Sequence, residues 1–130
     1  MTFVDTNVFM CAVGGDHPLR GDAIRFLSSS RGPEGERLVT SAEVVQELLH
    51  RYRAAGRRAS LGNALRAVDS HVAEVWSVEY ADVRLACELG DSHAELAARD
   101  LIHLACCRRR DVQRIKTFDA GLAAAFGSRT

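Results

Sequence analysis

Residues 2–9 of the chain read Thr-Phe-Val-Asp-Thr-Asn-Val-Phe, and this stretch decides the fold. Its first three residues form a short apolar run that ends at Asp5. So short a run at the beginning of the chain indicates a central strand that leads directly into a helix. We predict that this helix runs from about Thr6 to Val13 and stops at Gly14 and Gly15.

Extended and helical patterns alternate along the rest of the chain. Further strands are predicted at Leu38–Thr40, His71–Val78 and Val112–Phe118. Further helices are predicted after Pro18 as far as Ser28–Ser30, from Ser41 to near Gly56, and at Ser60–Ser70, Ala81–Leu89, Glu95–Arg108 and Ala120–Phe126. This alternation is typical of a parallel sheet whose two faces are covered by helices through right-handed crossovers. We therefore predict a three-layer α/β/α fold with a central parallel sheet of four to five strands.

The length and composition favour one globular domain. The chain has 130 residues, of which 47% are hydrophobic and 26% charged, so we expect a single domain over residues 1–130 whose core needs no disulfide. No apolar run is long enough to cross a bilayer, and residues 1–14 lack the basic start of a signal peptide, which predicts a cytoplasmic location. The four cysteines include no CxxC pair and are interpreted as free, mostly buried thiols.

The distribution of charge leaves two interpretations open for the arginines. The formal net charge is zero, so the chain lacks the overall positive charge by which many proteins hold nucleic acid. Basic residues follow several helices, at Arg51, Arg53, Arg57, Arg58 and Arg108–Arg110. Cations at helix C-termini stabilise the helix dipole, and this interpretation is favoured over contact with RNA phosphates. The aromatic residues are dispersed and form no evident stacking platform for bases.

Four acids are predicted to meet at one edge of the sheet. Asp5 follows the first strand, and Glu47 lies on the helix after the second. Asp100 lies early in the helix before the last strand, and Asp119 comes directly after that strand. In open parallel sheets, ligands bind outside the carboxyl ends of the strands. We therefore expect the four carboxylates to converge there.

Carboxylates crowded into one site repel each other unless they take up protons or bind a cation. Mg²⁺ and Mn²⁺ prefer oxygen ligands and are commonly held by a few carboxylates together with substrate phosphate oxygens. Phosphodiester hydrolysis is the natural use of such a site, because a bound metal ion activates water and stabilises the leaving oxygen.

Four segments of the chain also carry a resemblance to a known family. They are Phe3-Val4-Asp5-Thr6-Asn7-Val8-Phe9, Val44-Val45-Gln46-Glu47-Leu48, Arg99-Asp100-Leu101-Ile102-His103-Leu104-Ala105 and Lys116-Thr117-Phe118-Asp119. Together, in this order and at these separations, they resemble the signature segments of the PIN domain. The resemblance covers the whole chain and is greatest for the VapC toxins of toxin–antitoxin pairs.

The resemblance implies a PIN-like fold and an endoribonuclease that depends on Mg²⁺ or Mn²⁺. It implies that the catalytic residues and metal ligands are Asp5, Glu47, Asp100 and Asp119. The supporting polar residues that it implies are Thr6, Asn7 and Thr117. It further implies an RNA substrate, a cognate VapB-like antitoxin whose tail occupies the active-site groove, and a homodimer, with no membrane partner.

Several residues allow a second interpretation. Glu43 lies four residues before Glu47 on the same helical face, so either could point inward, although an acid in the first turn also suits the helix dipole. His103 stands one turn from Cys106 and Cys107, a spacing that could ligate zinc. With no second ligand pair elsewhere in the sequence, we interpret these three residues as core and its flank. His17 and His50 could serve as general bases, which two-metal hydrolysis does not need.

Two other functions compete with the nuclease hypothesis. A receiver-like phosphoacceptor domain also gathers acids and Mg²⁺ at strand ends, but it needs a second acid beside Asp5 and an aspartate that closes the third strand. A non-catalytic binding module on the same fold is the other alternative, since a fold does not fix a function. Nucleotide binding through a P-loop or a GxGxxG motif is excluded, because no such glycine pattern follows a strand.

Overall fold

The central sheet runs through the middle of the molecule, with the first strand of the chain inside it. The computed structural model describes residues 1–127, and the last three residues of the predicted domain lie outside this range. Within residues 1–127 the sheet has four parallel strands, in the order β3-β2-β1-β4. They are β1 (Thr2–Val4), β2 (Leu38–Ser41), β3 (Glu74–Trp76) and β4 (Ile115–Lys116). The predicted parallel sheet is confirmed.

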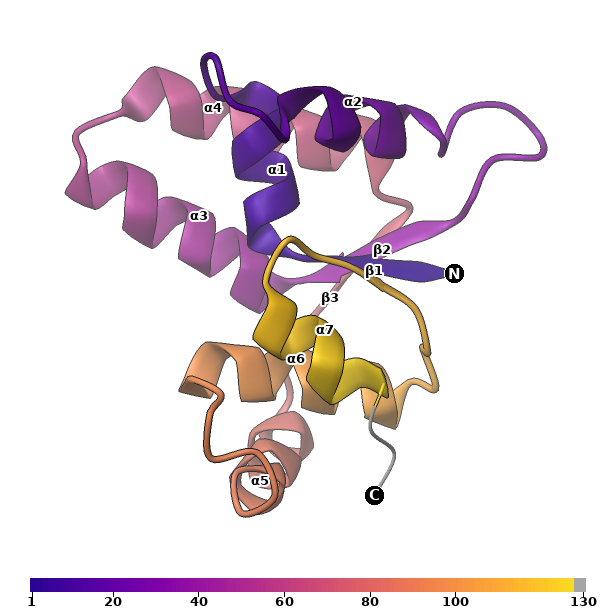
Figure 1. The fold of residues 1–130 in the computed structure, drawn as a ribbon, viewed down its shortest axis with the longest axis vertical. Coiled ribbons are helices and arrows are strands. Elements are labelled where there is room, and N and C mark those ends of the chain that lie inside the picture. The colour runs from indigo at the N-terminus through magenta and orange to yellow at the C-terminus, as the bar shows by residue number, and fades with distance from the viewer. Residues whose placement is uncertain (128–130) are drawn as a thin grey trace.

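Helices cover both faces of the sheet. Along the chain they are α1 (Thr6–Val13), α2 (Arg20–Ser28), α3 (Ala42–Ala54), α4 (Arg58–His71), α5 (Tyr80–Leu89), α6 (Ala98–Arg109) and α7 (Ala120–Gly127). Figure 1 shows α1 to α4 on one side of the sheet and α5 to α7 on the other, which confirms the predicted three layers. None of the helices that residues 1–127 form has the length and apolar character needed to cross a bilayer.

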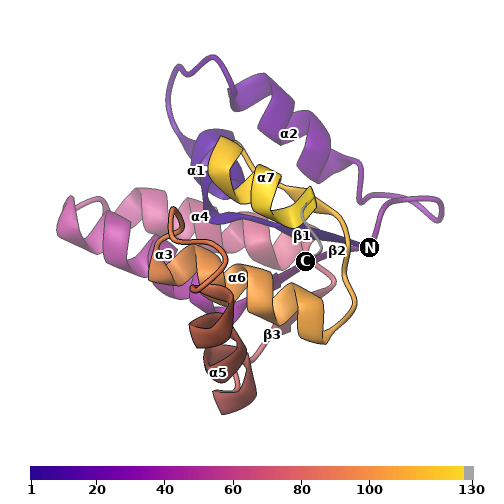
Figure 2. The same cartoon turned by 60° about the horizontal axis from the view of Figure 1, so that its bottom comes forward.

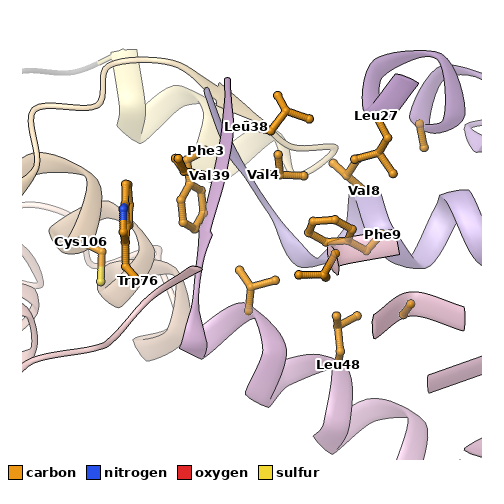
Figure 3. Packing of buried hydrophobic residues seen from close by; sticks show 14 of the residues in the cluster. Phe3, Val4, Val8, Phe9, Leu27, Leu38, Val39, Leu48, Trp76 and Cys106 are labelled. Atoms are coloured by element: carbon orange, nitrogen blue, oxygen red, sulfur yellow. The ribbon is translucent and has the colours of Figure 1, made fainter. Parts of the chain in front are cut away.

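The short strand β1 contributes side chains to the hydrophobic core on both faces of the sheet. Successive side chains of a strand point to opposite faces, so Phe3 and Val4 pack into different layers. Val4 lies with Phe9 of α1, whereas the Phe3 ring stacks on Trp76 with 5.8 Å between the ring centroids (Figure 3). Both faces of β1 are therefore buried, as the all-apolar run before Asp5 predicts.

Two strands are shorter than predicted. Residues 71–78 were expected as one strand, but α4 extends to His71, and the Val72 amide donates to the Val68 carbonyl at 2.9 Å. Only Glu74–Trp76 pair with β2, at the edge of the sheet. Residues 112–118 likewise yield only Ile115–Lys116, because the Val112 amide is held by the Cys107 carbonyl at 2.9 Å. The alternation of apolar and polar residues therefore predicts where a strand lies, but not how many of its residues pair with the neighbouring strand.

Two arginines at the end of α6 have a structural role. Nη1 of Arg109 and Nη1 of Arg110 lie 2.8 and 2.9 Å from Oδ1 of the fully buried Asp82 on α5. The Arg110 guanidinium also lies 4.9 Å from the centre of the Trp76 ring. Hydrogen bonds from both arginines help to hold the pKa of Asp82 well below its usual range despite the opposing effect of burial. These contacts tie α5 to α6, so RNA binding is not needed to explain this part of the arginine run.

Candidate metal site

A pocket of about 140 Å³ opens at the carboxyl ends of β1 and β4, beside α3 and the start of α6. It is lined by Asp5, Thr6, Asn7, Met10, Glu47, Arg51, Ala97, Arg99, Asp100 and Asp119. The structure thus brings all four acids of the sequence prediction to one place. Glu43 does not line the pocket, so α3 presents Glu47 rather than its rival. The placement of α6 beside α3 unites acids that are far apart in the sequence (Figure 2).

Asp5 stands at the junction between β1 and α1. The residue is 5% exposed, and its side chain caps α1, because Oδ1 accepts a hydrogen bond from the Thr6 amide at 2.8 Å. Oδ2 accepts a hydrogen bond from the Thr117 hydroxyl at 2.7 Å. A short strand followed at once by a capped helix therefore fixes this carboxylate at the edge of the sheet.

Glu47 lies on the second turn of α3 and is 8% exposed. Its Oε1 accepts a hydrogen bond from the Thr6 hydroxyl at 2.9 Å, and its Oε2 lies 3.2 Å from Nε of Arg51. His103, the Thr6 hydroxyl and Arg51 outweigh burial and lower the pKa of Glu47 to about 2. This carboxylate is therefore ionised at neutral pH.

Asp100 stands in the first turn of α6 and experiences the opposite effect. Burial, followed by the negative charge of Asp5 and those of Asp119 and Glu47, raises the pKa of Asp100 above its ordinary value. A bound cation would remove this conflict, because it would neutralise the charges that oppose ionisation of Asp100. The donor set of the pocket thus fits a divalent metal ion.

Asp119 is exposed, and it both caps a helix and lines the pocket. Its Oδ1 accepts hydrogen bonds from the amides of Gly121 and Leu122, at 2.8 and 3.2 Å, and thereby caps the start of α7. The same residue lines the pocket. An ordinary helix cap and a place in the site are therefore compatible here, as they are at Asp5.

The three predicted supporting residues join Asp5, Glu47 and Asp119 into one hydrogen-bonded network. The Thr117 hydroxyl accepts a hydrogen bond from the Asp119 amide at 3.0 Å and donates its own to Asp5. Asn7 spans the same gap, since its Oδ1 accepts from the Phe118 amide at 3.2 Å and its Nδ2 lies 3.4 Å from the Thr117 hydroxyl. These contacts fix the turn after β1 against the turn after β4.

One residue of the site was missed in the sequence. His103 is fully buried, and its Nε2 lies 3.6 Å from Oδ1 of Asp5 and 3.7 Å from Oε1 of Glu47. Its position three residues after Asp100 places it on the same face of α6, but this spacing does not reveal the contacts with Asp5 and Glu47.

The zinc interpretation of the same helix does not fit the structure. Cys106 and Cys107 are packed in the hydrophobic core, and burial raises the pKa of Cys106 to about 12 and that of Cys107 further. Zinc binds the thiolate form of cysteine, which these raised pKa values disfavour. The group of three possible metal ligands found among residues 1–127 is instead Asp5, Glu47 and His103.

Comparison with known proteins gives matches over almost the whole chain. The family model described as "PIN domain" matches residues 2–126. Ribonuclease VapC23 of Mycobacterium tuberculosis is 57% identical over 128 residues, which cover 98% of this chain and 100% of that protein. Ribonuclease VapC13 of the same species is 42% identical over 121 residues, with 93% and 92% of the two chains covered.

Solved structures also match. The crystal structure of M. tuberculosis VapC20, described as a sarcin-ricin loop cleaving toxin, superposes with a TM-score of 0.77. The two chains are 26% identical, and the match covers 96% and 95% of them. A toxin–antitoxin complex from Klebsiella pneumoniae gives a TM-score of 0.68 at 16% identity, over 100% of this chain and 97% of that one. At that identity the second match shows the fold alone.

Proposed function

The chain belongs to the PIN-domain family, and we propose from this premise that it is an endoribonuclease that acts as the toxin of a VapBC-like toxin–antitoxin pair. The observation that carries the proposal is the convergence of Asp5, Glu47, Asp100 and Asp119 on one pocket. The names of the relatives support the same activity, since they are VapC ribonucleases of nearly the same length.

We propose that the four acids hold Mg²⁺ or Mn²⁺. The raised pKa of Asp100 supports this, because burial and the charges of the neighbouring carboxylates outweigh the cations nearby and oppose its ionisation. When bound, such an ion activates water for attack on phosphorus and neutralises charge on the phosphate. Thr6 and Thr117 hold Glu47 and Asp5 in place for it through their hydroxyl groups.

The protein's own cations are suited to orient the RNA. Arg51 and Arg99 both lie near Oε2 of Glu47, at 3.2 and 4.0 Å, and their side chains are 54% and 41% exposed. A second, more open depression beside the pocket shares these two arginines and Met10. An RNA strand entering there would present its phosphates to two guanidinium groups next to the acids.

The remaining partners follow from the family resemblance. We propose that a VapB-like antitoxin inhibits the chain by placing its tail in the pocket, and the toxin name of a structural neighbour supports such a partner. Formation of a homodimer and a cytoplasmic location stay predictions. The receiver-like alternative is disfavoured because β3 ends at Trp76 and Ser77 follows it, so no aspartate closes that strand.

The direct test is cleavage of total cellular RNA by the purified, antitoxin-free chain. We expect discrete products with added Mn²⁺ or Mg²⁺ and none with a chelator, and cleavage should return when excess metal is restored. Sequencing of the product ends would identify the substrate. Absence of cleavage by the folded protein with either ion would contradict the nuclease proposal and favour a binding module.

Arg99→Ala should weaken RNA binding more than it slows chemistry. We expect the KM for the mapped substrate to rise about tenfold. The slope of log KM against log salt concentration should fall by the amount expected for the loss of roughly one phosphate contact. Measurement of kcat and KM at several salt concentrations would show this. Arg84→Ala on α5, which lies outside the pocket, is the matched control and should leave KM within about twofold. A lower kcat at unchanged KM would instead mean that Arg99 acts through Glu47.

A further inference from the structure

A buried imidazole without hydrogen bonds lies directly behind the acids. His103 of α6 is fully buried, and among the described residues neither of its ring nitrogens has a hydrogen-bond partner. Buried polar atoms in proteins nearly always have a partner, so an exception on a side chain that lies beside two acids of the pocket needs an explanation. The Phe3 ring, whose centroid is 5.5 Å away, packs against the imidazole in the core.

The distances around His103 Nε2 suit metal ligands better than hydrogen bonds. This nitrogen lies 3.6 Å from Oδ1 of Asp5 and 3.7 Å from Oε1 of Glu47, and one potential ligand atom from each of the three residues lies within 4.8 Å of the others. A charge-assisted N–H···O hydrogen bond is about 2.7–2.9 Å long. Two atoms that each bind one ion at about 2.1 Å, at angles of 90–120°, lie about 3.0–3.6 Å apart.

We propose that Nε2 of His103 is a further ligand of the ion held by Asp5 and Glu47, and that this nitrogen makes the site select a first-row transition ion over Mg²⁺. The inference rests on the proposed metal-dependent function. Mg²⁺ takes oxygen ligands and keeps several of its waters, whereas transition ions readily accept imidazole. A site with two carboxylates and one imidazole therefore discriminates against Mg²⁺ in a way that four carboxylates alone do not.

Helix α6 supplies both donors from one face. Asp100 and His103 are three residues apart, which places them about one turn from each other on the helix. Asp100 lines the open pocket, while His103 reaches the acids from the core side. The Asp100 carboxylate would thus approach the ion from the solvent side, and His103 Nε2 would approach it from the core side. Because the imidazole is enclosed, it adds a donor without narrowing the space for RNA.

The test uses Mn²⁺ as the probe and does not depend on RNA cleavage. Pulsed electron paramagnetic resonance of the native chain loaded with Mn²⁺ should show coupling to a directly bound imidazole nitrogen. His103→Gln should abolish this signal. Titration should show the Mn²⁺ affinity of His103→Gln about 10–100-fold lower, and Mg²⁺ affinity, measured by competition with Mn²⁺, changed by less than about threefold. Selectivity for Mn²⁺ over Mg²⁺ would then fall by about tenfold or more.

His93→Gln is the matched control, since His93 is 5% exposed and does not line the pocket. It should keep the nitrogen coupling and both metal affinities. Circular dichroism and thermal unfolding without metal would show whether each variant is folded, and His103→Leu gives a second, apolar substitution at the site. The signal of the native chain decides the proposal even where a variant does not fold.

The outcomes separate this inference from the proposed function. Nitrogen coupling in the native chain and a loss of Mn²⁺ selectivity in His103→Gln would support it. Tight binding of Mn²⁺ and Mg²⁺ without nitrogen coupling, or an equal loss of both affinities in His103→Gln, would overturn the role of His103 and leave the carboxylate site standing. Failure of the native chain to bind either ion would overturn both.

Discussion

Asp5→Asn is expected to lower the rate of RNA cleavage by roughly 10³-fold while the chain stays folded. Metal ions contribute several kcal/mol to the stabilisation of charge in the transition state, and each 1.36 kcal/mol corresponds to a tenfold change in rate. The substitution removes the charge at the centre of the site and keeps the size of the side chain. Single-turnover cleavage of the mapped substrate at saturating Mn²⁺ would measure the loss.

Asp5 also caps α1, and the fold should tolerate the substitution because asparagine can provide the same cap. Oδ1 of Asp5 accepts the hydrogen bond from the Thr6 amide, and asparagine is an equally good N-cap residue. Glu43→Gln is the matched control, because it neutralises an acid on α3 that does not line the pocket. It should cleave at close to the native rate. Comparable activity in Asp5→Asn and the native chain would remove Asp5 from the catalytic site.

The path of the chain near its start could be predicted from local chemistry. The bounds predicted for α1, Thr6–Val13, are those observed, because a capping acid precedes the helix and glycines follow it. The start of α6 was placed at Glu95 but lies at Ala98. The reason is a tight turn in which the Leu96 amide donates to the His93 carbonyl at 3.1 Å. The sequence between Gly90 and Ala98 gives no cap that marks this boundary.

The acids of the site could be predicted, but the imidazole could not. Parallel strands bring their carboxyl ends to one edge, so the position of Asp5 and Asp119 after β1 and β4 was sufficient to place them. His103 belongs to a helix with apolar residues on several sides, and only the packing of α6 against α3 and β1 decides which side faces the acids. Spacing along one helix gives the neighbours of a residue on that helix and says nothing of its contacts across the fold.

The same packing explains why the arginines divide into two groups. Arg109 and Arg110 point to Asp82 and stabilise the junction of α5 and α6, whereas Arg51 and Arg99 lie at the pocket. All four arginines stand near helix ends or near acids in the sequence. The sequence pattern alone therefore favours the same explanation for each of them, stabilisation of a helix end. The difference arises from the buried carboxylate of Asp82, which its sequence neighbours do not reveal.

Asp100→Asn should abolish metal-dependent cleavage to a similar extent, with a loss of about 10²–10³-fold, and yet make the metal-free chain at least as stable as the native one. Burial and the charges of neighbouring acids raise the pKa of Asp100 above its ordinary value of 3.8. A carboxyl group whose pKa is raised on folding destabilises the folded chain at any pH above that raised value, because it is then charged in both states. Asparagine removes this penalty and gives up a smaller, favourable interaction with the α6 dipole.

Thermal unfolding as a function of pH and metal would test this prediction. In chelator at pH 7–8, Asp100→Asn should unfold at the same or a higher temperature than the native chain. The difference should shrink as the pH falls through the raised pKa of Asp100 towards 3.8, because the carboxyl group of the folded chain takes up its proton above that value. Added Mn²⁺ should reverse the order, since an ion at 100 times its Kd stabilises the native chain by about 2.7 kcal/mol and the variant far less. A metal-free variant clearly less stable than the native chain at pH 8 would mean that Asp100 serves the fold rather than the metal ion.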